Sequence, residues 1–230
     1  MKERGIIFTG ESVRAIIAGR KTQTRRVMTS QPEEYSDIRV EAFRPARADR
    51  NGELFASKEI FGAYSTDGEW GLACPYGAPG DRLWVRETWC RAYDLDTEQP
   101  VEPPQYLYRA TEDRHVVHYE GGENQDGTER SPWRSPLLMP RLASRLTLEV
   151  VAVRVERVQE ISEAGAEAEG ADPIEDGEMY PDGTSNRWLS YRDGFRNGWD
   201  RINGKRPGCA WSDNPWVWVV EFRKREGTAP

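Results

Sequence analysis

The sequence predicts a mixed α+β fold, in which a small, closed or partly open β-barrel of about six mostly antiparallel strands carries helices on its outside. Several segments alternate apolar and polar residues with the period of two that is typical of half-buried strands, and others repeat apolar residues at helical spacing. In the strongest strand signal, residues 145–158, the apolar positions change parity half-way along. This change indicates the bulge or bend that barrel closure requires.

The first predicted elements are a strand and a helix. Residues 6–8 (Ile-Ile-Phe) predict a short strand, and the spacing of Val13, Ile16 and Ile17 predicts the helix that follows it. Gly19 then stands where a left-handed helix cap belongs. Residues 28–79 have weak periodicity and several Gly and Pro residues, so we expect a long insertion there rather than a core element.

The later elements follow from the same two periods. Ser162 is placed to cap a short helix within residues 161–170, and Asn203 with Gly204 ends a second one. The apolar residues that predict this second helix are Trp188, Tyr191, Phe195, Trp199 and Ile202. The remaining predicted strands lie within residues 82–89, 105–110, 115–119, 145–158 and 214–222. We expect a single domain over residues 1–230, with insertions near 28–79, 89–140 and 170–187.

Charge is distributed unevenly along the chain. The net charge is −7, yet residues 1–28 hold seven basic side chains and only two acidic ones. A local basic segment on an acidic protein argues against the wrapping of long duplex nucleic acid and favours a small anionic or nucleotide-sized partner. Solvated arginines at a helix end are the alternative interpretation.

The cysteines and the hydropathy indicate the compartment. Three widely spaced cysteines form no C-x-x-C pair, as is common in a reducing cytoplasm. The chain shows neither a signal-peptide pattern nor the ~18 consecutive apolar residues of a membrane span. We therefore expect a cytoplasmic protein without a membrane partner.

Lys21 and Thr24 lie three residues apart, directly after the break at Gly19. If a tight turn continues there, the two side chains converge, and a lysine shielded from water has a lowered pKa and can act as a base on the threonine hydroxyl. The alternative is an exposed lysine beside an unremarkable threonine. A carboxylate on the helix within 161–170 would hold the lysine, and periodicity leaves Glu163, Glu167 and Glu169 open as candidates.

The sequence predicts no metal site and no cofactor. His115 and His118 are three apart in a predicted strand, so they point to opposite faces and cannot chelate one ion together. Trp211, Trp216 and Trp218 offer either stacking surfaces for a base or ordinary core packing.

On these residues the chain resembles the ASCH superfamily, whose fold is a PUA-like β-barrel. The signature G-x-K, followed by a polar residue and an arginine, is matched by Gly19, Lys21, Thr24 and Arg26. Supporting matches, in the right order and over roughly half the chain, are Gly80-Asp81 before a strand, the strand 147–158, the helix 161–170 and the closing strand 216–222. The longer form is similar to ASCH proteins commonly encoded in prophages.

The resemblance implies an activity, because small bacterial ASCH proteins include amidohydrolases that remove the acetyl group of N4-acetylcytidine. The catalytic residues that it implies are Lys21 as base, Thr24 as nucleophile and Glu169 as orienting or relay group. The substrate-binding residues that it implies are Gly19, Arg20, Arg26, Trp84, Arg86 and Glu87. The expected partner is a nucleoside or nucleobase, with RNA or DNA as further candidates, and the oligomeric state is left open.

Two other functions remain open at this point. PUA-like barrels often bind nucleic acid without chemistry, so a non-catalytic reader of RNA or modified DNA is the second hypothesis. A phage accessory or morphogenesis factor is the third, although the sequence has no coiled-coil or repeat pattern in its favour.

Overall fold

The computed structural model describes residues 1–32, 37–92, 100–102, 104–112, 133–176 and 188–225. They fall into two compact units. The first unit is made from Met1–Lys2, Arg20–Asp81 and Glu149–Arg223, and the second from Glu3–Gly19, Arg82–Leu148 and the residues from Lys224 onward.

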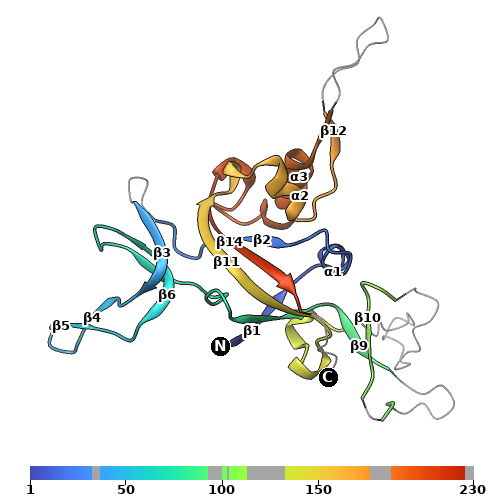
Figure 1. Cartoon of the computed structure of the whole chain (residues 1–230), viewed down its shortest axis with the longest axis horizontal. Helices are drawn as coiled ribbons and strands as arrows, with labels where there is room; N and C mark the ends of the chain where they lie inside the picture. The colour runs from blue at the N-terminus through green and yellow to red at the C-terminus, as the bar shows by residue number, and fades with distance from the viewer. Residues whose placement is uncertain (33–36, 93–99, 103, 113–132, 177–187, 226–230) are drawn as a thin grey trace, which may run out of the picture. The chain divides into compact units, whose positions relative to one another are not determined.

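The main sheet of the first unit contains β2 (Gln23–Val27), most of β14 (Trp216–Lys224) and most of β11 (Thr147–Arg157), in the order β11-β14-β2 (Figure 1). β14 pairs with β2 in antiparallel register. Its Val217 and Val219 are fully buried, as are Trp218 and Val220 on the opposite parity, so β14 is covered on both faces. β2 is the outermost strand of this sheet.

Two helices pack beside this sheet. α2 (Glu163–Ala168) begins after Ser162, whose side chain accepts from Gly165 N, and α3 (Tyr191–Asn203) ends at Gly204. In α3, Tyr191, Phe195 and Trp199 face the core as predicted, whereas Ile202 is 60% exposed. Trp188 lies in strand β13 (Trp188–Ser190), which pairs with β12 (Ile174–Asp176), so its assignment to the helix was wrong. The buried cluster shared by helices and sheet consists of Val158, Ile161, Ala166, Trp199, Trp211, Val217 and Val219.

Residues 38–73 form a second sheet in the first unit, where an insertion without core elements was expected. It has the order β3-β6-β7, built from β3 (Ile38–Phe43), β6 (Ile60–Ser65) and β7 (Gly71–Ala73). A hairpin of β4 (Ala46–Ala48) and β5 (Leu54–Ala56) lies between its first two strands along the chain. These strands were not predicted from the sequence because the buried residues of β6, Ala63 and Ser65, are small and give only a weak hydrophobic alternation.

The second unit begins with β1 (Glu3–Ile7), which pairs in parallel with β8 (Arg82–Arg86). Along the chain, the helix α1 (Gly10–Ile17) follows β1. Thr9 caps the start of α1, and its hydroxyl accepts from Ser12 N. β9 (Trp89–Arg91) and β10 (Tyr106–Tyr108) form a short antiparallel ladder. The 3₁₀ turns η1 (Pro136–Leu138) and η2 (Arg141–Ala143) complete the unit, and the strand predicted at 115–119 lies outside the described residues.

The α+β class is confirmed, with strands more numerous than helices in the described chain. The strand orders are those of open sheets, and none of the described sheets closes on itself, so the PUA-like barrel stays a prediction. In β11, Leu148 and Val150 are buried, as the first parity predicts. Val151, which the second parity turns inward, is 50% exposed, and residues 152–157 are all partly buried, so the burial does not show the predicted change of face. Among the described residues, no helix has both the length and the apolar character for crossing a membrane.

Two glycine substitutions test the packing of these elements. A Cβ on Gly62 would lie 2.2 Å from the Leu72 carbonyl oxygen in the neighbouring strand, whereas a Cβ on Gly198 in α3 meets nothing within 4 Å. We expect Gly62→Ala to lower the free energy of unfolding by about 1–3 kcal/mol and Gly198→Ala to raise it by about 0.5–1 kcal/mol. Urea unfolding measures both, and a neutral Gly62→Ala would contradict the β6–β7 pairing.

Candidate functional site

The turn that precedes the candidate site is where the sequence predicts it. α1 ends at Ile17, and Gly19 has a φ of +75°, the left-handed conformation that favours glycine. Arg20 follows with a side chain 53% exposed, and it reaches the exposed Asp172 at 3.4 Å. An ion pair so open to water contributes little to the free energy of folding, so this contact does not fix the position of the Arg20 side chain.

Lys21 is buried against the end of α2 and contacts Glu169 twice. Its Nζ donates to Oε2 and to the backbone carbonyl oxygen of Glu169, both at 2.6 Å. The two side chains are each 5% exposed. The backbones also form an antiparallel bridge, and Thr22 N donates to Ala168 O at 2.8 Å. The last carbonyls of a helix lack partners within it, so a cation at this end stabilises them.

Only one of the three candidate glutamates meets the lysine. Glu163 accepts hydrogen bonds from the backbone N–H groups of Tyr191 and Arg192 at the start of α3. Glu167 is exposed, one residue before the end of α2. Glu169 follows that end as the helix cap, where its side chain turns inward.

Arg25 completes the buried charge cluster, and sequence analysis had not singled it out. Its NH1 lies 3.2 Å from Glu169 Oε1, and its Nε and NH2 lie 2.7 and 2.6 Å from Glu156 Oε1. Its side chain is 2% exposed and lies over the Phe195 ring, 5.9 Å from the centroid. Lys21, Gln23 and Arg25 share one parity, so the alternation of β2 was the signal that could have found it.

The pKa of Lys21 is lowered, first of all because burial disfavours the charged amine. Glu169 opposes this shift through charge and hydrogen bonding, while Arg26 and Arg25 reinforce it. Burial also lowers the pKa of Arg26, which Tyr76 and Glu169 partly offset. The lysine is therefore held between a favourable carboxylate and two neighbouring guanidinium groups.

Thr24 is buried close to Lys21 in the sequence, but its hydroxyl contacts a different side chain. Thr24 Oγ1 accepts from Arg26 Nε at 3.3 Å, and Thr24 is 3% exposed. The expected tight turn ends at Gly19, and the chain runs extended through β2 after Lys21. Thr24 and Arg26 therefore have the opposite parity from Lys21, and the turn does not bring the hydroxyl and the amine together.

Trp84, Arg86 and Glu87 belong to the second unit, where each has partners of that unit. Arg86 lies over Trp84, 5.3 Å from the ring centroid, and donates to the carbonyl oxygens of Pro136 (2.9 Å) and Leu137. Glu87, 1% exposed, accepts from Nε and NH2 of Arg145, both at 2.9 Å. These contacts are those of residues that hold the unit together.

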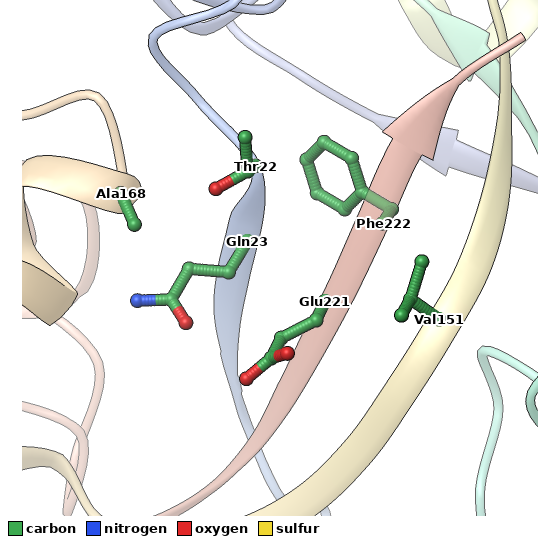
Figure 2. Close-up of a pocket in the computed structure, with 6 residues that line it drawn as sticks. All are labelled: Thr22, Gln23, Val151, Ala168, Glu221 and Phe222. Carbon is green, nitrogen blue, oxygen red and sulfur yellow. The ribbon is translucent and has the colours of Figure 1, made fainter.

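A pocket of about 310 Å³ lies in the first unit, between the end of α2 and the sheet (Figure 2). Its lining residues are Thr22, Gln23, Val151, Ala168, Glu221 and Phe222. Thr22 follows Lys21 and Ala168 precedes Glu169 in the chain, yet neither charged residue lines the pocket itself. None of these lining residues was predicted from the sequence.

The described residues contain no group of three or more His, Cys, Asp or Glu side chains that could hold a metal ion. His115 and His118 lie outside the described part of the chain.

The chain matches no family model, and no curated protein or solved structure matches it either. The ASCH resemblance rests on the sequence motifs alone.

The charge cluster predicts the effect of removing its central carboxylate. Glu169→Gln leaves the buried Lys21 amine without a counter-charge, which costs about 3–5 kcal/mol for a buried pair. Adding Lys21→Met removes the unpaired charge, so the double variant is expected to regain part of this loss. Urea unfolding of the two single variants and the double variant measures the coupling, and strictly additive losses would contradict it.

The lowered pKa of Lys21 predicts the pH dependence of stability. Between the folded-state pKa and the ordinary value of 10.5, the unfolded chain binds one more proton than the folded protein, so the free energy of unfolding rises with pH there. Lys21→Met lacks this contribution. We expect the wild type to gain stability relative to Lys21→Met as the pH approaches 10.5, and urea unfolding at a series of pH values checks the sign.

Proposed function

We propose that this protein is an ASCH-type amidohydrolase that removes an acyl group from a modified nucleoside such as N4-acetylcytidine. The observation that supports this most directly is the contact of buried Lys21 with Glu169, two of the three residue types that the resemblance implies for catalysis. A cytosine amide has a carbonyl carbon that an activated hydroxyl can attack. The PUA-like barrel is part of the same proposal.

Lys21 acts as the general base in this proposal. Burial favours the neutral amine, and a neutral amine has two N–H donors and one lone pair. The carbonyl and carboxylate oxygens of Glu169 both accept from Nζ, and these two contacts hold the amine in position. Glu169 is thus the orienting group, and Arg25 holds its second oxygen.

Thr24 is the nucleophile, and Arg26 Nε donates to its oxygen. A guanidinium at that position stabilises negative charge as the hydroxyl loses its proton. Strand alternation separates the Thr24 hydroxyl from the Lys21 amine in the unliganded structure, so the proposal requires that substrate binding bring the two within reach of one bridging water, through which the proton passes to Lys21. Thr24 Oγ1 attacks the acetyl carbon, the C–N bond breaks, and the leaving amine takes the proton from Lys21. Water then hydrolyses the acetyl-threonine ester and releases acetate.

A non-catalytic nucleic-acid reader is the second candidate, and one observation favours it. The cluster brings Lys21, Arg25 and Arg26 together against the carboxylates of Glu156 and Glu169. An excess of cations attracts phosphate whether or not chemistry follows.

Incubation of the purified protein with N4-acetylcytidine, followed by chromatography of cytidine and acetate, tests the proposal. We expect turnover by the wild type and a loss of about 10²-fold or more in Lys21→Ala, Thr24→Ala and Glu169→Ala. The wild-type rate should rise with pH below 10.5, because the neutral form of Lys21 is the active one.

Glu167→Ala is the matched control, since this glutamate lies on the same helix and is exposed. It should keep full turnover. Absence of wild-type turnover, together with salt-sensitive binding of RNA or DNA, would contradict the amidohydrolase and favour the reader. Circular dichroism of each variant separates loss of activity from loss of folding.

A further inference from the structure

We propose that strand β3 pairs with β3 of a second copy of this chain, antiparallel, in the register that sets Val40 opposite Val40 of the other copy. The sheets of the two copies then join into one continuous sheet across a twofold axis. In this register Arg39 of each copy lies opposite Glu41 of the other. The inference concerns assembly and does not depend on the proposed function.

β3 is the longer of the two edge strands of its sheet. The strand order is β3-β6-β7, so β3 and β7 each have one side that pairs with no other described strand. β7 spans only Gly71–Ala73, and such short strands protect an edge, whereas β3 spans Ile38–Phe43 and contains no proline. An edge of this length offers a row of backbone N–H and C=O groups to a further strand.

The hydrogen bonds of the sheet determine which backbone groups of β3 point outward. Thr66 N donates to Asp37 O at 3.0 Å, and these two residues continue the antiparallel register of β3 and β6. In such a ladder every second pair of opposite residues exchanges hydrogen bonds. The odd-numbered residues 37–43 therefore bond to β6. The residues whose backbone groups face the free edge are Ile38, Val40 and Ala42.

The ladder between β6 and β7 agrees with this assignment. Ser65 N donates to Trp70 O and Cys74 N donates to Phe61 O, both at 2.9 Å. Residues 61, 63 and 65 of β6 thus bond to β7, which leaves residues 60, 62 and 64 for β3. In the observed register these lie opposite residues 43, 41 and 39.

The proposed register satisfies the outward backbone groups and the charges together. With Val40 opposite Val40, Ile38 lies opposite Ala42, and each of these pairs exchanges backbone hydrogen bonds. Arg39 and Glu41 form the pairs in between, which exchange no backbone bonds and in which the side chains lie closest. Both side chains are exposed, and opposite charges that face each other across a ladder stabilise it.

The neighbouring registers are disfavoured by the same charges. A shift in one direction sets Arg39 opposite Arg39, and a shift in the other sets Glu41 opposite Glu41. Charges of a single sign along an edge keep other strands away, whereas β3 carries opposite signs two residues apart on one face. The strand is therefore complementary to a reversed copy of itself, which identifies a second copy of this chain as its partner.

β6 holds the charged side chains in place before any pairing. Tyr64 lies opposite Arg39 in the ladder, and its hydroxyl donates to Glu41 Oε1. Phe43 packs on the same side, with 4.9 Å between its ring centroid and that of Tyr64. On the opposite face Val40 is partly exposed, so contact of the two Val40 side chains across the axis buries apolar surface.

Sedimentation velocity of the full chain over a concentration series tests the assembly. A single pair of edge strands buries little surface, so we expect a weak dimer whose fraction rises with concentration. Added salt should weaken it, because the paired charges are exposed. A chain that stays monomeric up to about 1 mM, where even a weak specific contact is populated, would overturn the inference.

Charge reversal tests the register. Arg39→Glu sets acidic side chains opposite each other and Glu41→Arg sets basic ones opposite each other, so each variant alone should raise the dissociation constant about tenfold or more. An equimolar mixture of the two variants restores opposite charges in both pairs and should form a mixed dimer with an affinity near that of the wild type.

Arg50→Glu is the matched control for these variants. It makes the same charge change at an exposed residue between β4 and β5, outside β3, and should keep the wild-type dissociation constant. Equal weakening by Arg50→Glu, or no recovery in the mixture of the two charge variants, would refute this register.

Proline substitution tests the backbone pairing. The Val40 N–H points to the free edge, so Val40→Pro removes a hydrogen bond of the dimer and none of the β3–β6 ladder. We expect this variant to remain folded by circular dichroism and to sediment as a monomer. A folded Val40→Pro variant that dimerises as well as the wild type would place the contact elsewhere and contradict pairing through β3.

Hydrogen exchange at low and high protein concentration gives a readout that needs no variant. The amides of Ile38, Val40 and Ala42 should exchange more slowly as the dimer forms, whereas those of Arg39 and Glu41 are already bonded to β6 and should change little. A dimer that leaves the exchange of the Val40 amide unchanged is incompatible with the inference.

Discussion

The burial of Lys21 is the constraint on which the first unit depends. An amine 5% exposed, beside two guanidinium groups, is tolerated only where carboxylate and carbonyl oxygens surround it. Glu169 provides both kinds of oxygen because it follows the last turn of α2, where backbone carbonyls have no helical partner. The end of α2 and the start of β2 must therefore meet at this point, and the two elements are fixed to each other by charge as well as by apolar packing.

The cluster continues from Lys21 toward the pocket as a row of alternating charges. Glu169 bridges Lys21 and Arg25, and Glu156 in turn bridges Arg25 and Arg154. Arg154 ends the row at Glu221, on the pocket wall. Exposure rises along it, from 5% at the Lys21 side chain to 41% at Glu221, so the inner pairs are strong and the outer ones weak. A change of charge in the pocket is therefore felt mainly by Arg154, and the Lys21–Glu169 contact is insulated from it.

The parts of this arrangement that sequence could predict are the ones with a strong local signal. Capping by Ser162, the left-handed Gly19 and the apolar spacing of α3 are local, and the structure has all three. The sheet at residues 38–73 was missed because small buried residues carry little hydrophobic signal. Arg25 of β2 was missed although it shares the parity of Lys21. Glu221 was missed for another reason, since its position beside Gln23 depends on which strand neighbours which, and periodicity within one segment does not contain that information.

The buried polar side chains of β2 and of Lys21 just before it are not explained by fold stability alone. An inward-facing strand position is filled most stably by an apolar side chain, and replacing a buried ion pair by well-packed hydrophobic residues is often neutral or stabilising. Lys21, Gln23 and Arg25 occupy three successive positions of one parity, all buried, where apolar residues would pack against α2 at lower cost. Stability of the fold alone gives no reason for polar groups at all three. What the three side chains share is a partner at or beside α2: Lys21 bonds to Glu169, Gln23 to the Gly165 carbonyl oxygen and Arg25 to Glu169, so this edge strand is joined to the helix by polar contacts.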